Sequence, residues 1–380
     1  MSISEEIARL VYFGASHEPQ WFIQYCKELP EVGPGEVLVK VRLATICASD
    51  LHTFAGVRNE PLPAVLGHEA VCDVIVDRRS NEENEFVFLP DENTGHDGTE
   101  ENGPSSDSSI PLSPGTRVTF GVPLSCKQCE RCRLGVTQKC KSLFKYGHCA
   151  LNDGGGFSGC YATHMLLRAG THIVPLPPQV TDKMAAPINC ALATIVNVVE
   201  NARTQSRNKV AVVQGAGILG TYACAMLSRK GYQRVLCTDV NQSRLNVVRK
   251  FGGEPLYVQD VSKYTDFADC VIEVCGSPTV VEDGINMLRY GGTYVWAGMV
   301  HRDSTLSVTG ESVIRKSITI KGIHNYEDRH LTEAVTFLRD TSHLFPYEEL
   351  LSPMTFSLKD FGKAVHLAES RTFLRVGIQP

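Results

Sequence analysis

Four residues in the N-terminal part of the chain have the types and the spacing for zinc chemistry. Cys47 and His68 offer a thiolate and an imidazole, two ligand types that Zn²⁺ prefers. Ser49 and His52 follow the cysteine closely, and a hydroxyl and a second imidazole could carry a proton away from a metal. A catalytic zinc needs three protein ligands, an open position and such a route. The residues therefore predict two ligands and a proton relay; the plainer alternatives are a buried thiol, a structural histidine, a turn hydroxyl and a solvated histidine.

A second group of thiols lies in the segment 126–140. Two C-x-x-C steps and a fourth cysteine are typical of a tetrahedral structural zinc site with no open position. The same ligands could hold an iron–sulfur cluster, although zinc is favoured. The predicted ligands of this zinc lobe, which would do no chemistry, are Cys126, Cys129, Cys132 and Cys140.

A dinucleotide-binding pattern begins at residue 209. An apolar segment, 209–214, predicts a strand that runs into G-x-G-x-x-G and then a helical pattern. A second predicted strand, 234–238, ends at Asp239. That carboxylate would accept hydrogen bonds from ribose hydroxyls and repel a 2′-phosphate, which predicts NAD rather than NADP, with the pyrophosphate at the helix N-terminus. The predicted cofactor-binding residues are Gly215, Gly217, Ile218, Leu219, Gly220, Asp239, Arg244 and Val274.

The elements that position these residues divide the 380-residue chain into two predicted domains. Apolar strands alternate with helical patterns over 191–321, which predicts a doubly wound Rossmann domain. Because this domain lies inside the chain, 1–190 and 322–380 are expected to form the other domain together. The segment 79–112 is acidic and rich in Gly, Ser and Asn, which predicts a disordered insertion. The smaller predicted elements are strands at 36–43 and 374–378 and helices at 327–339 and 359–369.

Composition excludes several classes of partner. A net charge of −5 argues against nucleic acids and anionic membranes. The longest apolar stretch, 184–199, is too short and too polar to span a bilayer. The N-terminus lacks the basic start and apolar run of a signal peptide, so the 14 cysteines indicate a reducing compartment and thiolates on metal. We expect a soluble cytoplasmic protein that acts on a small molecule.

Together these residues resemble the zinc-dependent alcohol dehydrogenases of the medium-chain dehydrogenase/reductase superfamily. The motifs that carry the resemblance are Cys47-x-Ser49-Asp50-x-His52, Gly67-His68-Glu69, the four-cysteine lobe and the glycine motif with Asp239. The resemblance implies a GroES-like, mostly β catalytic domain built from both termini, a Rossmann domain, and a homodimer or homotetramer. It also implies two zinc ions per chain and NAD-linked interconversion of an alcohol and its aldehyde or ketone.

The resemblance further implies roles for individual residues. Ser49 would take the substrate's proton and pass it to His52, and Asp50 would orient His68. The third catalytic-zinc ligand would lie near the start of the long helix that enters the Rossmann domain, predicted at 184–192, where Cys190 is the only thiol. Relatives place an acidic residue in this region, so a small buried helix residue is the alternative. Glu69 is a further candidate ligand, which in relatives binds directly, through water, or in exchange with the substrate oxygen.

Within that superfamily the chain resembles in particular the phosphonate-catabolism-associated alcohol dehydrogenases. The matching stretches are 140–148, 185–194 and 320–326, and Cys149 departs from the acidic residue expected there. This subgroup implies a hydroxyalkylphosphonate substrate. Four residues could recognise its anionic group or could be ordinary surface and packing residues: Arg58, Lys145, His148 and His324.

Three other functions fit part of the pattern. A polyol or amino-alcohol dehydrogenase shares nearly all of the motifs. A zinc-free quinone reductase of the same superfamily needs neither ligand set, so the presence of both argues against it. A non-catalytic protein could keep zinc and NAD for structure or redox sensing, and zinc content together with turnover separates these functions.

Overall fold

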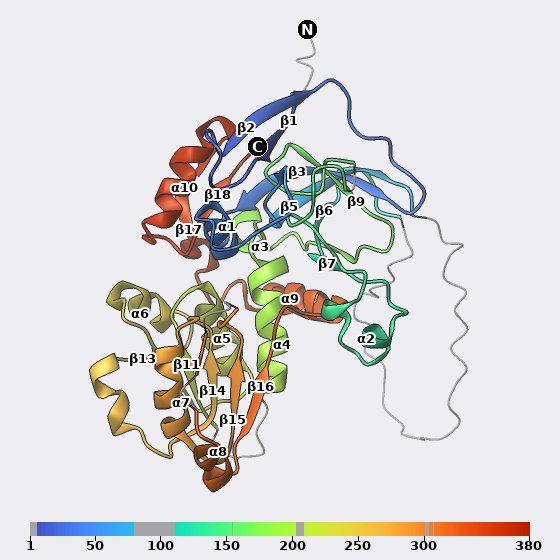
Figure 1. Ribbon diagram of the computed structural model, residues 1–380. Helices are drawn as coiled ribbons and strands as arrows, with labels where there is room; N and C mark the ends of the chain where they lie inside the picture. The colour runs from blue at the N-terminus through green and yellow to red at the C-terminus, as the bar shows by residue number, and fades with distance from the viewer. Residues whose placement is uncertain (1–5, 80–110, 154, 203–208, 301–303, 307) are drawn as a thin grey trace, which may run out of the picture.

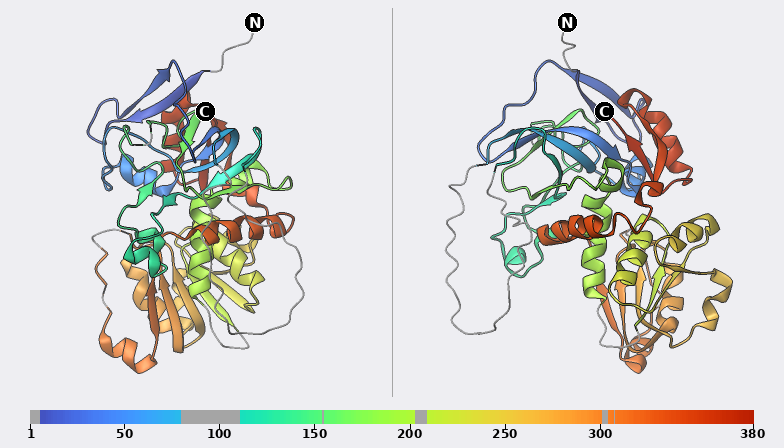
Figure 2. Two further views of the ribbon diagram at one scale, coloured as in Figure 1. Left: turned by 90° about the vertical axis from the view of Figure 1, so that its right-hand side faces the viewer. Right: turned by 180° about the vertical axis from the view of Figure 1, so that it is seen from behind.

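The computed structural model describes residues 6–79, 111–153, 155–202, 209–300, 304–306 and 308–380, and it has two parts (Figure 1). One part is mostly β and combines the N-terminal half of the chain, up to α3, with the C-terminal strands and α10 (Phe361–Glu369). The other is an α/β part formed by the middle of the chain. The helix α9 (Asp328–Thr341) lies between the two parts, and α4 (Ala193–Asn201) packs against it and runs on beside the α/β part (Figure 2). Among the described residues, no helix is long and apolar enough to cross a membrane.

The main sheet of the β part brings distant segments to one edge. Its strand order is β10-β6-β5-β3-β18-β17, and β9 also pairs with β3. Since β3 is antiparallel to both β5 and β18, the end of β3 lies beside the start of each, with Thr45 opposite Glu69 and Gly377. The strands are β3 (Val37–Thr45), β5 (Glu69–Asp77), β6 (Arg117–Phe120), β9 (His164–Leu167), β10 (Ile173–Pro175), β17 (Leu351–Phe356) and β18 (Arg375–Ile378).

Smaller elements complete the β part. A three-stranded sheet has the order β2-β1-β4, and a two-stranded ribbon joins β7 to β8. These elements are β1 (Ile7–Tyr12), β2 (Trp21–Cys26), β4 (Ala64–Val65), β7 (Pro123–Leu124), β8 (Phe144–Lys145), α1 (Ala48–Phe54), α2 (Glu130–Arg133) and α3 (Asp182–Ala185).

The α/β part is a six-stranded sheet in which every neighbouring pair is parallel, in the order β13-β12-β11-β14-β15-β16. The strand order reverses between β11 and β14, the place where doubly wound sheets bind nucleotides. The central strands are apolar along their length because helices cover both faces. The elements are β11 (Val210–Gln214), β12 (Arg234–Thr238), β13 (Glu254–Leu256), β14 (Ala268–Glu273), β15 (Leu288–Trp296), β16 (Thr319–Gly322), α5 (Ile218–Arg229), α6 (Gln242–Arg249), α7 (Val281–Met287) and α8 (Gly310–Lys316).

Most predicted elements agree with the structure to within two residues, but the helix predicted at 184–192 is wrong. In the structure α3 ends at Ala185, a π-helical turn covers Ile188–Leu192, and α4 follows directly. Pro187 has no backbone N–H to donate, so a continuous α-helical ladder cannot pass through it. The π turn carries Cys190 and contacts both β5 and α5. Most of the predicted insertion, 80–110, lies outside the described residues.

Candidate active site

Four potential metal ligands meet at the sheet edge described above: Cys47, His68, Glu69 and Cys190. One ligand atom from each lies within 4.8 Å of the others, and only Cys190 is more than marginally exposed. Cys47 is the N-cap of α1. His68 directly precedes β5 and Glu69 begins it, while Cys190 comes from the π turn. The pairing of Thr45 with Glu69 fixes the first two segments side by side. The structure thus gathers every predicted catalytic-zinc ligand in one place.

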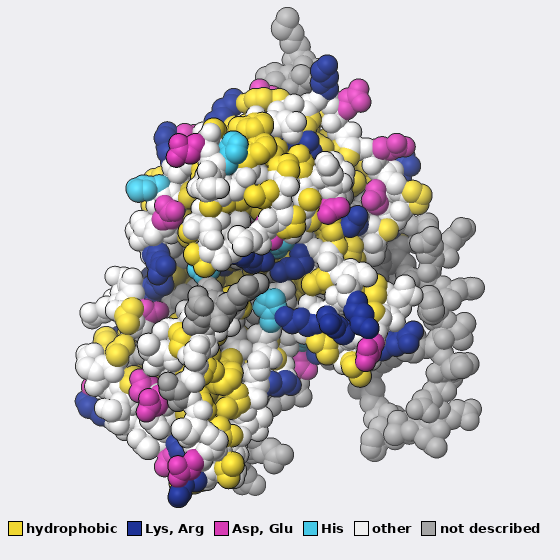
Figure 3. All heavy atoms as spheres, in the orientation of Figure 1, with side chains coloured by type: hydrophobic (Ala, Val, Ile, Leu, Met, Phe, Trp, Pro, Cys, Tyr) yellow, Lys and Arg dark blue, Asp and Glu magenta, His cyan; other side chains and the backbone are white. Residues whose placement is uncertain are grey.

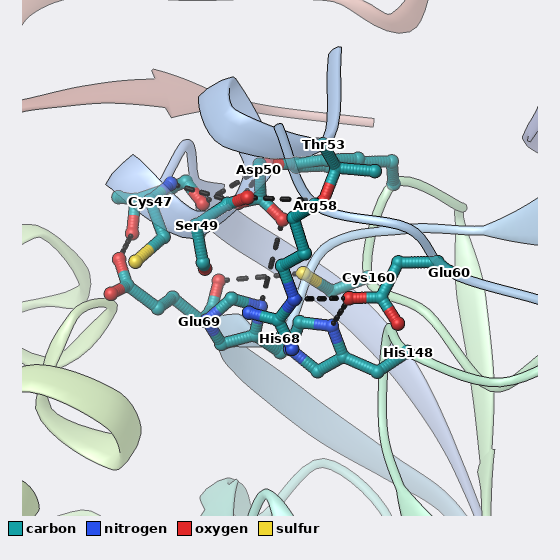
Figure 4. A network of polar contacts seen from close by, with 12 residues as sticks. Cys47, Ser49, Asp50, Thr53, Arg58, Glu60, His68, Glu69, His148 and Cys160 are labelled. Carbon is teal, nitrogen blue, oxygen red and sulfur yellow. Dashed lines mark hydrogen bonds and ion pairs between the residues drawn. The ribbon is translucent and has the colours of Figure 1, made fainter. Parts of the chain in front are cut away.

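Asp50 connects this cluster to its surroundings (Figure 4). One oxygen accepts hydrogen bonds from the Cys47 backbone N–H and the Tyr161 hydroxyl, both at 2.9 Å. The other lies 3.7 Å from Nδ1 of His68. Burial raises the pKa of the Asp50 carboxyl, while the facing His68 imidazole opposes the rise. Asp50 is therefore placed to fix the Cys47 loop and to orient the His68 ring, with Nε2 left for a metal.

The chemistry of the donor set fits zinc. The Cys190 thiol hydrogen-bonds to the sulfur of Cys47, and this bond, helped by the Arg375 guanidinium, lowers the pKa of Cys47. The same bond, together with burial, raises the pKa of Cys190. His68 Nδ1 is buried without a hydrogen-bond partner among the described residues. Two soft sulfurs that share a proton beside an imidazole form the Cys₂His set of a catalytic zinc with one open position.

Arg375, which the sequence analysis did not identify, lies behind this cluster. Its guanidinium donates to both oxygens of Glu69, at 2.7 and 2.8 Å, and one nitrogen lies 3.5 Å from Cys47 Sγ. Thr45 Oγ1 donates to the same carboxylate at 2.5 Å. Burial raises the pKa of Glu69, and the guanidinium opposes that rise. Oε2 of Glu69 thus accepts two of these hydrogen bonds and Oε1 accepts one. In the sequence, the feature that could have indicated Arg375 was a single arginine within the otherwise apolar strand near the C-terminus.

The predicted relay residues lie at the start and end of α1. Ser49 is half-buried and its side chain points toward the space between Cys47 and His68 (Figure 4). Its hydroxyl makes no hydrogen bond to any residue that the structure describes, which disfavours the interpretation as a backbone-bonded turn hydroxyl. His52 is half-buried in the last turn of α1.

The four cysteines of the predicted lobe also meet, with their sulfurs within 4.8 Å of one another. The shortest separations are 3.4 Å for Cys140–Cys126, 3.5 Å for Cys129–Cys132 and 3.9 Å for Cys129–Cys140. Four sulfurs about 2.3 Å from a tetrahedral zinc stand roughly 3.8 Å apart. Backbone N–H groups donate to Sγ of Cys140 at 3.3 Å, and others lower the pKa of Cys129 to about 6, whereas burial raises the pKa of Cys132.

This lobe gives the first testable prediction. Cys132→Ser is expected to lower bound zinc by one ion per chain and to reduce the melting temperature by several degrees, because a structural metal contributes folding free energy. Cys26→Ser is the matched control, since Cys26 is a half-buried thiol outside both clusters. Elemental analysis and calorimetry measure the two effects, and unchanged zinc in Cys132→Ser would contradict the lobe.

The glycine motif has the geometry that a pyrophosphate needs. Gly215 has φ +111°, and a Cβ on Gly220 would lie 1.8 Å from the Gly215 carbonyl oxygen. At Gly217, the N-cap of α5, the space within 4 Å of a Cβ is empty. The first and third glycines therefore serve close packing, and the second leaves room for phosphate.

Asp239 directly follows β12 and lies beside this loop. Its two oxygens accept hydrogen bonds from the backbone N–H groups of Ala216 and Asn241, both at 2.7 Å. A cavity of about 310 Å³ opens next to it, lined partly by Leu245, Tyr257 and Val258. Its lining combines these apolar side chains with the polar Gln242 and Gln259. Of the other predicted cofactor residues, Ile218 and Leu219 begin α5, Arg244 is in α6, and Val274 follows β14.

Comparisons with known proteins match both parts of the chain to dehydrogenase domains. The model of the family "Zinc-binding dehydrogenase" matches residues 219–340, and that of the "Alcohol dehydrogenase GroES-like domain" matches residues 33–85. The L-threonine 3-dehydrogenase of Legionella pneumophila (strain Corby) is 26% identical over 319 residues, which is 79% of this chain and 80% of the relative.

Solved structures show the same fold over the whole chain. An alcohol dehydrogenase of Thermotoga maritima has a TM-score of 0.85 at 22% identity and covers 99% of this chain and 100% of its own. A putative zinc-binding dehydrogenase of Sinorhizobium meliloti bound to NADP has a TM-score of 0.79 at 18% identity, with coverage of 99% and 100%. The predicted fold class, a GroES-like domain plus a Rossmann-type domain, is confirmed, and in sequence the chain is similar to L-threonine 3-dehydrogenases.

Proposed function

We propose that this chain, which carries the two domains of zinc-binding dehydrogenases, is a zinc-dependent, NAD-linked oxidoreductase that interconverts an alcohol and its aldehyde or ketone. The observation that supports this proposal most is that Cys47 and His68 meet Cys190, which stands on the π turn that also contacts the nucleotide helix α5. Three ligands with an open fourth position are typical of a catalytic zinc, whereas four thiol ligands leave no open position. One catalytic and one structural zinc per chain are therefore proposed.

In this proposal the protein positions a proton route beside the metal ligands. Zinc supplies a Lewis acid and NAD a hydride acceptor when they are bound. The Ser49 hydroxyl, which has no protein partner among the described residues, takes the proton of the substrate hydroxyl and passes it toward His52. Asp50 holds the His68 ring through its contact with Nδ1.

Asp239 supports NAD over NADP, and its replacement gives the second prediction. Asp239→Ser is expected to raise the ratio of kcat/KM for NADP to that for NAD by about 10- to 100-fold, because a carboxylate that repels a 2′-phosphate is lost. Arg244, whose Nε is buried without a hydrogen-bond partner among the described residues, would then contact the phosphate. Adding Arg244→Ala should therefore reduce the gain, and an unchanged cofactor ratio in Asp239→Ser would contradict this role.

Turnover with members of three substrate classes identifies the substrate. The threonine dehydrogenase relative favours an amino alcohol as a second candidate, while the predicted subgroup favours a hydroxyalkylphosphonate, and polyols are the third class. The test is NADH formation with members of each class and with simple alcohols, on protein of measured zinc content. Protein with two zinc ions and no turnover of any alcohol or carbonyl would favour a non-catalytic redox sensor.

Four further features belong to the proposal. We propose a catalytic domain of residues 1–190 and 322–380 and a nucleotide domain of residues 191–321, in a homodimer or homotetramer located in the cytoplasm. The end of β16 at Gly322 lies one residue beyond the second boundary. Light scattering of the purified protein measures the oligomer.

A further inference from the structure

Five basic side chains gather beside the proposed zinc site, and we call them the cation group: Arg58, Lys139, Lys145, His148 and His324. Figure 3 shows Lys, Arg and His side chains collected in the middle of one face, between the β part and the α/β part. The members come from four separate segments of the chain, so only the fold brings them together. The proposed proton route uses none of them.

One end of the cation group touches the metal ligands. The His148 ring packs against the His68 ring, with centroids 4.7 Å apart. His148 Nδ1 lies 2.9 Å from Glu60 Oε1, and Arg58 Nε lies 2.5 Å from the same oxygen (Figure 4). Both His148 and Glu60 are almost fully buried. Within the part of the chain that the structure describes, Glu60 is the carboxylate in contact with the group, and it is already shared between two of the members.

At the other end Lys139 and His324 form a pair of hydrogen-bond donors. Lys139 Nζ lies 2.5 Å from His324 Nδ1. Since an ammonium can only donate, Nδ1 accepts, and the ring proton must be on Nε2. Burial, followed by the charges of the two nearby lysines, lowers the pKa of His324 to about 4, in agreement with a neutral ring. The pair therefore offers an ammonium and an imidazole N–H.

Lys145 lies between these two ends. It interacts electrostatically with Arg58, Glu60, Lys139 and the metal ligand Cys190. Its ammonium makes no hydrogen bond or ion pair to any residue in the described ranges, although the side chain is half-buried. Burial, and then the Arg58 charge, lower its pKa. Placing an uncompensated ammonium in such a position is costly, and a bound anion would offset the cost.

We propose that the cation group binds the acidic part of the substrate, a dianionic phosphonate or phosphate group on a short hydroxy or oxo compound. This inference rests on the proposed function, because it orients the substrate hydroxyl toward the ligands Cys47, His68 and Cys190. Lys139 and Lys145 have no carboxylate partner within the described residues, so two positive charges remain for the ligand. A dianion matches them better than a monocarboxylate does. An amino acid such as threonine would also bring an ammonium into a positive environment, which disfavours it.

Binding of methylphosphonate to the NAD-loaded protein tests the inference without turnover. Calorimetry is expected to show that methylphosphonate binds at least about tenfold more tightly than acetate. Lys145→Met should weaken methylphosphonate binding by at least about tenfold, and Lys139→Met, at an exposed position, should weaken it in the same direction. Lys141→Met is the matched control, because Lys141 is exposed, nearby and paired with Glu130 at 3.3 Å, and it should bind like the wild type. Comparing the affinities for phosphate and for methylphosphonate shows whether the site prefers a phosphate or a phosphonate as the dianion.

Turnover separates failure of this inference from failure of the proposed function. The ratio of kcat/KM for 2-hydroxyethylphosphonate to that for 1-propanol is expected to fall at least tenfold in Lys145→Met and to stay constant in Lys141→Met. Turnover of neutral alcohols without methylphosphonate binding would contradict the anion-binding role of the cation group and leave the proposed dehydrogenase function intact. Methylphosphonate binding that needs Lys145, without any NAD-linked turnover, would contradict the dehydrogenase function and leave the anion-binding role intact. Equal binding of acetate and methylphosphonate would overturn the preference for a dianion.

Discussion

Replacing Cys47 with alanine is expected to remove one of two bound zinc ions and to lower kcat/KM by at least about 10³-fold. Cys47 supplies one of only three proposed protein ligands, and the partner sulfur of Cys190 and the imidazole of His68 cannot complete the set alone. A Lewis acid contributes several kcal/mol to stabilising charge in the transition state, which corresponds to this factor. Elemental analysis and NADH formation measure the two losses on the same sample.

A second buried thiol serves as the control for this substitution. Cys72 lies in β5, a few residues beyond Glu69, and is fully buried but outside both thiol clusters. Burial raises its pKa. Cys72→Ala should keep both zinc ions and most of the turnover, with a modest loss of stability. Full zinc content and normal turnover in Cys47→Ala would refute the proposed active site.

The parts of the site predicted from the sequence are those with a local signal. Cys47 and His68 stand in short polar motifs beside apolar strands, and a register in which Thr45 faces Glu69 is enough to bring them together. The strands β11 and β12 were predicted to within one residue because they are buried on both faces and therefore uniformly apolar. In both cases the determining interaction lies close in sequence or repeats along a strand.

Features that depend on distant contacts were not predictable in the same way. Two-residue strands such as β7 and β8 exist only because they pair with each other. The π turn at Cys190 depends on packing between β5 and α5, although Pro187 signalled a break. In the cation group, four members were candidates as separate residues, but Lys139 and the carboxylate of Glu60 were not, because their roles come from neighbours far along the chain.

Arg375 is the clearest case, and its replacement gives the second large expected effect. It pairs with Glu69 across 306 positions of sequence, and the two side chains are 7% and 0% exposed. Arg375→Leu is expected to reduce the free energy of unfolding by about 3–5 kcal/mol, because it leaves a buried carboxylate without its partner. Chemical denaturation of zinc-loaded protein, with zinc content measured in parallel, gives this value.

A double-mutant cycle separates the ion pair from the shape of the arginine side chain. Replacing both partners by leucine removes the uncompensated charge, so Glu69→Leu combined with Arg375→Leu should recover more than half of the stability lost in Arg375→Leu alone. Arg234 is the matched control: it makes a similar two-pronged contact with Glu254 at 2.6 Å, but both side chains are more than 40% exposed. Since water screens that pair, Arg234→Leu should cost less than about 1 kcal/mol. Equal losses at the two arginines, or no recovery in the double variant, would contradict the proposed cost of leaving the buried Glu69 carboxylate without its partner.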